Sequence, residues 1–216
     1  MPIDRKSILK AVSEAKKNSD KREFSQTIDL IVILKDIDLK KPENRINELV
    51  ELSHPPKPKV KVTVFAGGDL ALRAEKAGAD IVLGREDVER FVNNKKSVKK
   101  LVDETDFFLA ETSLMATVGK VLGPVLGPRG KMPTPVPPMA PVDTIVNRHR
   151  KSVRVRVRDQ PNAQVSVGTE VMSDEMLAEN IQSIIALLER KLAKGLRNIR
   201  SASVKTTMGS PVRIDF

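Results

Sequence analysis

The sequence predicts a mixed α/β protein of two domains, and three observations support this. A proline-rich segment, residues 53–59, interrupts a first group of strands. Strand and helix patterns then alternate, which is typical of a parallel sheet covered on both faces. From residue 153 the period-two pattern of strands returns. We therefore expect an α+β terminal domain with an antiparallel-type sheet and covering helices, residues 1–59 and 153–216, and an inserted Rossmann-like α/β domain of three layers, residues 60–152.

The first segment is expected to hold a helix and one or two strands. Asp4 can cap a helix, because apolar residues return at helical spacing from Ile8 to Ala15. Residues 27–34, TIDLIVIL, are rich in β-branched side chains and predict a strand. Residues 45–52, RINELVEL, are ambiguous, because their apolar positions fit a short helix better than strict alternation.

The inserted segment alternates strands and helices. Strands are predicted at residues 61–66, 80–84 and 106–111, with helices between them and a helical run at 112–120. The stretch VGKVLGPVLGPRGKMPTPVPP, residues 118–138, predicts a rigid basic turn, because glycine and proline interrupt it repeatedly. A second linker is expected near residues 149–152.

The last segment predicts strands and one long helix. VRVRVRD puts valines on one face and arginines on the other, at Val153, Val155 and Val157 and at Arg154, Arg156 and Arg158. We expect it to form a hairpin with the next strand, AQVSVGTE, residues 163–170. Ser173 begins an amphipathic helix that Gly195 is expected to close. A strand, SASVKTTM, and a short tail follow.

Composition narrows the class of protein. The 216 residues include no cysteine and two histidines, which excludes disulfides and thiolate sites and argues against a histidine metal cluster, so no metal or cofactor is expected. No apolar run approaches the roughly 20 residues that span a bilayer, so we expect a cytoplasmic protein without membrane contact. The net charge of +10 is spread along the chain and indicates a polyanionic partner.

No enzymatic motif is complete. Gly67 and Gly68 lie where a dinucleotide-binding turn would, but G-x-G-x-x-G is missing and Asp69 would oppose an anion. We favour a plain βα turn and keep a nucleotide-binding enzyme using Gly67–Gly68 as the alternative. The 118–138 stretch lacks the first glycine and the hydroxyl of a Walker A loop. His54 and His149 have no catalytic partner in the sequence, so we expect solvated linker histidines.

Three features could contact RNA, and each has a structural alternative. The arginines of VRVRVRD either form the solvent-exposed face of a sheet or contact phosphate. Phe24, in the charged run KREFSQ, is either buried or contacts a base or ribose. TTMGSP, residues 206–211, combines hydroxyl donors with a glycine that permits close backbone approach, although its chemistry alone favours an ordinary strand end with a turn.

Three stretches together resemble the L-one family of large-subunit ribosomal proteins. They are VGKVLGPVLGPRGKMPTP, SVKTTMGSPVRI and REFSQTIDLIVIL, and the similarity covers essentially the whole chain. KPENR and SHPPKPK look archaeal. The resemblance implies binding to 23S-type ribosomal RNA, a mobile stalk near the exit site of deacylated tRNA, and, in many members, repression through the protein's own mRNA. It also implies a strand at residues 45–52, which we adopt over the helical pattern.

The resemblance also implies the residues of an RNA-binding cluster. They are Phe24, Ser201, Thr207, Met208 and Gly209, with Ser203 and Thr206 beside them. For phosphate contact we add the basic residues Arg22, Arg154 and Arg156. Many members of the family carry a basic residue just before the phenylalanine, where this chain has Glu23. The expected partners are ribosomal RNA, the protein's own mRNA and tRNA, the free protein is expected to be a monomer, and the paired linkers predict an open-to-closed motion of the inserted domain.

Overall fold

The computed structural model describes residues 4–41 and 44–215, apart from the side chains of residues 93 and 95. The chain divides into two compact units, Met1–Pro58 with Lys151–Phe216 and Lys59–Arg150. Their secondary structure is mixed, with antiparallel sheets in the first unit and a parallel sheet in the second. No helix of the described residues is long and apolar enough to cross a membrane.

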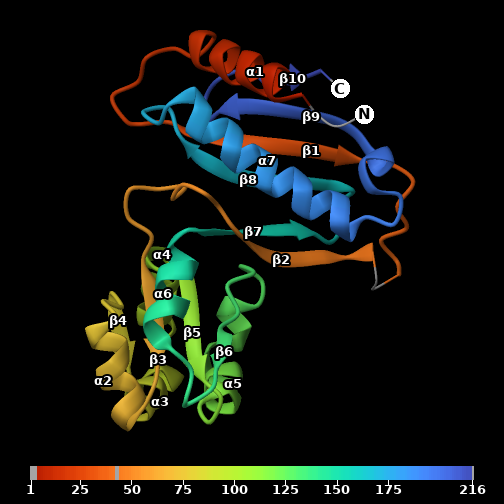
Figure 1. Cartoon of the computed structure of the whole chain (residues 1–216). Coiled ribbons are helices and arrows are strands. Elements are labelled where there is room, and N and C mark those ends of the chain that lie inside the picture. Colours follow the sequence, from red (N-terminus) through yellow and green to blue (C-terminus); the bar gives the residue numbers. More distant parts are fainter. Residues whose placement is uncertain (1–3, 42–43, 216) are drawn as a thin grey trace. The chain divides into compact units, whose positions relative to one another are not determined.

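A four-stranded antiparallel sheet, in the order β10-β9-β1-β8, organises the first unit (Figure 1). Its strands are β1 (Thr27–Leu34), β8 (Asn162–Thr169), β9 (Ile199–Thr206) and β10 (Val212–Ile214). Strict alternation buries every second residue of β1, from Ile28 to Leu34. One face of the sheet therefore enters the core, and the other carries the alternate residues of β1, Thr27, Asp29, Ile31 and Ile33.

Two helices pack on the apolar face of this sheet: α1 (Arg5–Lys17) and α7 (Asp174–Lys191). The α1 helix begins at Asp4, whose side chain accepts from the Lys6 amide, and contacts β9 and β10. The α7 helix begins at Ser173, which accepts from Met176, and contacts β8. A short 3-10 helix, η3 (Gly195–Asn198), follows α7. The C-cap of α7 is Leu192. Gly195, which was expected to close this helix, lies beyond it, at the start of η3.

A separate two-stranded sheet, β2 (Ile46–Glu51) with β7 (Ser152–Val157), packs on the same core. The hairpin expected between residues 153–158 and 163–170 is therefore wrong: β7 pairs with β2, and β8 pairs with β1. Period-two alternation predicts which face of a strand is buried, but not which strand is its partner. The strand implied for residues 45–52 is confirmed. Its pattern looked helical because Glu48, on the core side, forms an ion pair with Lys191.

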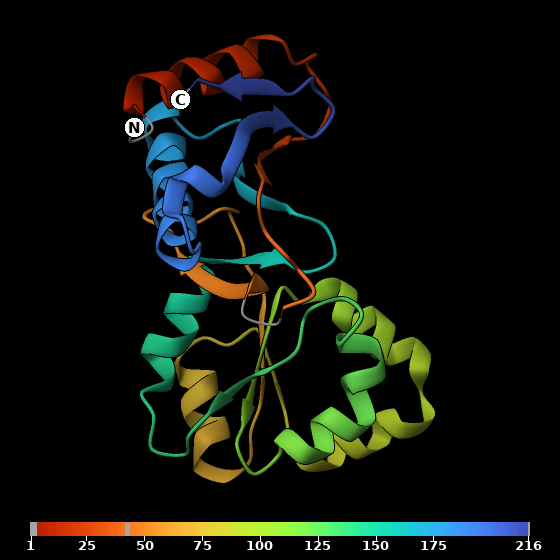
Figure 2. The ribbon, with the colours of Figure 1, turned by 90° about the vertical axis from the view of Figure 1, so that its right-hand side faces the viewer.

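The second unit is a three-layer α/β structure around a parallel sheet in the order β4-β3-β5-β6. The strands are β3 (Val62–Phe65), β4 (Ile81–Leu83), β5 (Phe107–Glu111) and β6 (Thr134–Val136). Figure 2 shows this sheet between two groups of helices. On one side lie α2 (Gly68–Lys76) and α6 (Val142–Arg150). On the other lie α3 (Arg85–Arg90), η2 (Phe91–Asn93), α4 (Lys95–Glu104) and α5 (Met115–Leu126).

The glycine- and proline-rich stretch 118–138 is only partly a turn. Its first part continues α5 to Leu126 with Pro124 inside the helix, because Val118, Leu122 and Leu126 are buried at helical spacing. Its second part supplies β6, where Pro135 is tolerated because β6 is an edge strand. The linker expected at 149–152 is also corrected. The α6 helix runs to Arg150, β7 begins at Ser152, and one residue lies between them.

Candidate nucleic-acid interface

The candidate interface begins on the face of the four-stranded sheet that is opposite α1 and α7. On β9, Ala202 and Val204 enter the core, so Ser201, Ser203 and Lys205 point to the other side. All three are partly exposed. We call this surface the open face. Hydroxyl and ammonium groups at every second residue offer donors to an acceptor-rich ligand along the strand.

The turn after β9, Thr207–Gly209, closes one end of the open face. The Thr207 hydroxyl accepts from the Thr27 amide at 3.0 Å and donates to the Thr27 carbonyl at 3.3 Å. The Met208 amide donates to the Gln26 side chain at 3.2 Å. The turn is therefore fixed to the start of β1, while the Met208 side chain remains 62% exposed. A flexible apolar side chain is presented to solvent on a rigid backbone.

Gln26 organises this end of the sheet and was not predicted as a functional residue. Its side chain is fully buried and donates to Ser19 Oγ at 2.8 Å and to the Asp20 carbonyl at 2.9 Å, while it accepts from Met208. Its backbone exchanges hydrogen bonds with Glu170. A signal was present in the sequence: Gln26 precedes β1 in the phase of its buried residues, and a buried amide requires partners.

Thr206 and Gly209 hold the turn from inside. Thr206 is fully buried, and its hydroxyl donates to Ser19 Oγ at 2.9 Å and accepts from the Gly209 amide at 3.1 Å. A Cβ atom added to Gly209 would lie 2.3 Å from the Thr206 hydroxyl oxygen. Thr206 has no exposed atom with which to contact RNA, so its role is to position Thr207 and Met208. Gly209 is required there by close packing rather than by a positive φ.

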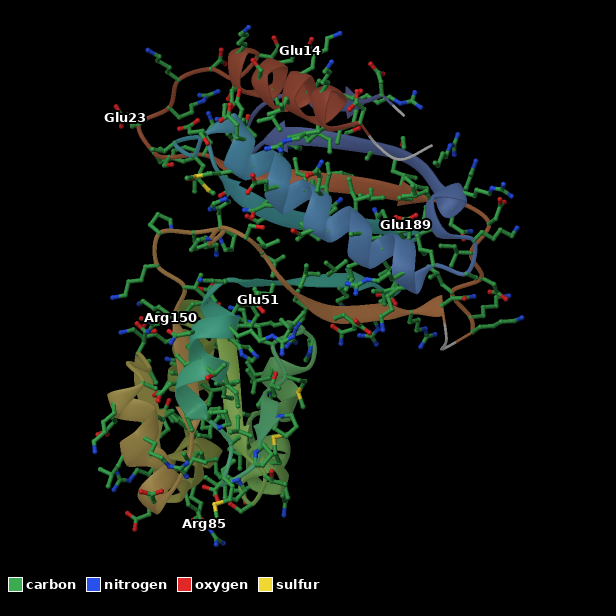
Figure 3. All side chains as sticks on the ribbon, in the orientation of Figure 1. Glu14, Glu23, Glu51, Arg85, Arg150 and Glu189 are labelled. Carbon is green, nitrogen blue, oxygen red and sulfur yellow. The ribbon has the colours of Figure 1, made fainter. Side chains whose placement is uncertain are left out.

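Phe24 lies two residues before Gln26, at the same end of the sheet as the turn. Its ring is 52% exposed, so the alternative of a buried phenylalanine is ruled out. Arg22 is also exposed and pairs with Asp20 at 3.5 Å. In Figure 3, Glu23 is on the outer side of this loop, away from the sheet. An exposed ring and an arginine can supply stacking and phosphate contact together.

The arginine stripe lies elsewhere in the first unit. Arg154 and Arg156 are on β7, in the two-stranded sheet, opposite Leu49 and Asn47 of β2. Burial, and then the charge of Arg156, hold the pKa of Arg154 below its usual value. The predicted residues therefore form two groups. Ser201, Ser203 and the 207–209 turn share one sheet with the Phe24 loop, and the two arginines belong to the other sheet.

Asp29 and Lys205 were also missed, although the alternation of β1 and β9 places them on the open face. They are direct partners in the register of the two strands. Burial raises the pKa of Asp29, and the positive charge of Lys205 partly opposes this effect. The partly buried carboxylate of Asp29 offsets the positive charge of Lys205, so this part of the open face is less favourable for binding phosphate.

The second unit offers no free phosphate cradle at Gly67–Gly68. The Gly67 amide, at the start of α2, already donates to Glu111 Oε2 at 3.1 Å, and Ser113 donates to Oε1 of the same carboxylate at 2.6 Å. The hydrogen bond from Ser113, and then that from Gly67, hold the pKa of Glu111 below its usual value. The place of an anion at this helix N-terminus is taken by a side chain.

The basic residues of the 118–138 stretch also have structural roles. The Lys131 ammonium donates to the carbonyls of Val102 and Thr105 at 2.7 Å, at the C-terminus of α4. Arg129 forms an ion pair with Asp103 on the same helix. These contacts anchor the end of the stretch to α4.

The expectation of solvated linker histidines is wrong for His149, which is buried, and holds in part for His54, whose side chain is partly exposed in residues 53–59. His54 Nε2 lies 3.0 Å from Glu179 Oε2, and its backbone amide and carbonyl both bond to the Asn180 side chain at 3.0 Å. His149 is buried in α6, packs edge-on against Phe107 and donates to the Ile145 carbonyl at 2.8 Å. Among the described residues, no group of histidine and acidic side chains could hold a metal ion.

Comparison with known proteins agrees with the sequence motifs. The sequence model of the family described as "Ribosomal protein L1p/L10e family" matches residues 13–210. A protein of Methanothermobacter thermautotrophicus named "Large ribosomal subunit protein uL1" is 46% identical over 207 residues, which is 96% of this chain and 98% of the relative. Proteins of the same name from Methanothermococcus thermolithotrophicus, at 47% over 213 residues, and Archaeoglobus fulgidus, at 42% over 214, cover 99% of this chain and 100% of each relative. These names describe ribosomal proteins and not enzymes. Because the family model and these relatives match most of the chain, the chain belongs to the ribosomal protein L1p/L10e family.

Proposed function

We propose that this protein is a structural constituent of the large ribosomal subunit in the cytoplasm, where it binds 23S-type ribosomal RNA through its first unit. The complex forms the mobile stalk near the tRNA exit site and assists release of deacylated tRNA. The observation that supports this most directly is the rigid 207–209 turn with an exposed Met208, beside the exposed ring of Phe24 and next to the open face. Family membership makes ribosomal RNA the natural ligand of this surface.

The chemistry of the surface favours recognition of RNA shape. The partly exposed hydroxyls of Ser201 and Ser203 can bond to phosphates and ribose 2′-hydroxyls, while Phe24 and Met208 can pack on a sugar or a base. Lys205 and Arg22 supply charge without sequence selectivity. RNA affinity should therefore fall with salt, with a slope set by the number of phosphates neutralised.

The test is RNA binding by variants of the turn. Met208→Asp places a carboxylate where RNA phosphates approach, and Thr207→Val removes the hydroxyl that holds the turn to Thr27. We expect affinity for a stalk fragment of large-subunit ribosomal RNA to fall about 10- to 100-fold, since a lost specific contact costs about 1–3 kcal/mol. Fluorescence anisotropy measures this loss.

Leu72→Asp is the matched control, because Leu72 is similarly exposed, at 59%, but lies on α2 of the second unit. It should leave RNA affinity unchanged. If Met208→Asp bound the stalk fragment as tightly as the wild type does, the turn would not be part of the RNA interface.

The same surface would bind a similar RNA fold in the protein's own mRNA and so repress its translation. The hydroxyls of Ser201 and Ser203, beside Asp29 and Lys205, can bond to a folded RNA backbone without reading one sequence, which supports this second use. Competition between the ribosomal stalk fragment and the leader of the protein's mRNA tests the proposal. Mutual displacement is expected, and simultaneous binding of both RNAs would contradict a shared site.

A further inference from the structure

A basic cavity lies at the end of the four-stranded sheet that is opposite to the 207–209 turn. Its volume is about 690 Å³. Its charged lining comes from the end of β1, from the η3 region, from β9 and from β10: Lys35, Asp36, Lys194, Arg197, Arg200 and Arg213. Leu196 and Ile199 complete it. Five cations from different segments thus converge on one hollow that contains a single carboxylate.

The charge of this cavity is not balanced within the part of the chain that the structure describes. None of the five cations forms an ion pair with a described residue, whereas some other surface cations do, such as Arg85 with Glu89 at 3.0 Å. Like charges in one hollow repel each other, and an anion that enters the hollow removes this repulsion. The cavity therefore favours a ligand that carries several negative charges.

The backbone around the cavity is held in place by Asn198, which is 2% exposed. Its side-chain oxygen accepts from the Lys194 amide at 2.8 Å, and its side-chain nitrogen donates to the Lys35 carbonyl at 3.0 Å. The Lys35 amide in turn donates to the Asn198 carbonyl at 2.7 Å. Asp36 adopts a φ of 56° in the same turn. The segments that carry Lys35, Lys194 and Arg197 are thus locked together before any ligand binds.

The cavity adjoins the open face. Arg213 of β10 pairs directly with Ser203 of β9, one of the open-face serines. From Thr207 to Arg200 is seven residues of extended chain, about 23 Å at strand rise. A ligand that contacts the turn and the cavity must therefore extend along the whole of β9. The lining contains no aromatic side chain for base stacking and many groups for phosphate.

We propose that this cavity binds backbone phosphates of the same RNA, as a second contact that is separate from the turn and rests on the proposed function. Arginine forks and lysine ammonium groups bind phosphate oxygens, and the cavity has the size of a nucleotide-binding pocket. The turn and Phe24 select the RNA, and the cavity anchors its backbone at the far end of β9.

The test uses the full chain and a labelled stalk fragment of large-subunit ribosomal RNA at several salt concentrations. In the double variant Arg197→Gln, Arg213→Gln, affinity should fall about tenfold, and the dependence of log affinity on log salt should flatten by about 0.7–0.9 per lost phosphate contact. The control Lys6→Gln, Lys10→Gln removes the same charge from exposed positions of α1 and should change neither quantity. Circular dichroism checks the fold, and Lys35→Gln, Arg200→Gln repeats the test if the first variant is unfolded.

The outcomes separate this proposal from the proposed function. Wild-type affinity and salt slope in both cavity variants, while the wild type binds RNA, would overturn the cavity contact alone. Failure of the wild type to bind the stalk fragment would overturn both. A thermal shift of the wild type with inorganic pyrophosphate, absent from variants that keep wild-type RNA affinity, would assign the cavity to a free anion instead of RNA. Weaker binding with an unchanged salt slope would contradict phosphate contact.

Discussion

At the scale of single residues, the turn after β9 depends on a glycine, Gly209, because it leaves no side-chain atom beside Thr206. Gly209 carries no Cβ, and this permits its amide to reach the hydroxyl of buried Thr206 at 3.1 Å. That hydroxyl also bonds to Ser19, so one contact joins the turn to the loop after α1. The exposed Met208 owes its fixed position to these buried neighbours.

We expect Gly209→Ala to destabilise the first unit by about 1–3 kcal/mol, because a new Cβ would lie 2.3 Å from the Thr206 hydroxyl and displace its hydrogen bonds. Urea unfolding measures the change. Gly119→Ala is the matched control, since a methyl group added there would meet no atom within 4 Å and alanine is favoured inside a helix such as α5. Equal stability of the two variants would mean that the turn can relax around the added methyl group.

The residues of this site differed in how far the sequence could predict them. The family resemblance, and not the chemistry of these residues alone, pointed to one cluster at Phe24 and Thr207–Gly209, and the structure brings these residues to one end of the sheet. Gln26 was missed because a polar residue before a strand usually indicates a turn, although Gln26 continues the phase of the buried residues of β1. The basic cavity was missed because its cations are far apart in the chain and meet through the β1–β9–β10 pairing.

At the scale of elements, the N-terminus of α2 shows why a glycine-rich turn need not bind a nucleotide. The Glu111 carboxylate, at the end of β5, is bonded to the Gly67 amide, and its charge interacts favourably with the positive end of the helix dipole. The contact joins β5 to α2 within the second unit. The turn has a structural function that a phosphate would have to displace.

We expect Glu111→Gln to lower the stability of the second unit at neutral pH by about 0.5–1 kcal/mol, a small value because the site is partly solvated. The pKa of Glu111 is lowered in the folded protein from 4.5, so its charge stabilises the fold above that pH, and this stabilisation is lost as the pH falls through the folded-state pKa. The difference between the wild type and Glu111→Gln should therefore disappear in acid. Urea unfolding at pH 7 and at a series of lower pH values tests this, with exposed Glu75→Gln on α2 as the control. A difference that did not shrink as the pH fell would contradict the electrostatic origin.

Element prediction succeeded where burial followed a single period and failed where another interaction disturbed that period. The alternation of β1 and the helical spacing of α1 are strict, and both elements form where predicted. In β2, Glu48 occupies a core-facing position through its ion pair with Lys191, so the pattern looked helical. In α5, burial of Leu122 and Leu126 outweighs the helix-breaking tendency of Pro124.

At the scale of the whole molecule, two connections join units that each have their own core. The first connection begins after His54, because Asn180 binds both backbone groups of that residue, and it runs through the proline-rich residues 55–58. The second is reduced to Lys151, whose carbonyl accepts from the Leu52 amide at 2.9 Å. Both connections therefore leave the first unit side by side, as a hinge requires.

We expect the second unit to move relative to the first about this hinge, and RNA binding to change the distribution of their separations. Because the chain contains no cysteine, Lys10→Cys with Lys76→Cys gives one spin label on an exposed position of each unit. Double electron–electron resonance spectroscopy should show a broad distribution of distances between the two labels in the free protein. This distribution should shift or narrow when the stalk fragment binds. Lys76→Cys with Lys100→Cys places both labels within the second unit and should give one narrow distribution in both states. A single narrow distance between the two units, identical with and without RNA, would show that the proline-rich connection is rigid. It would contradict the open-to-closed motion.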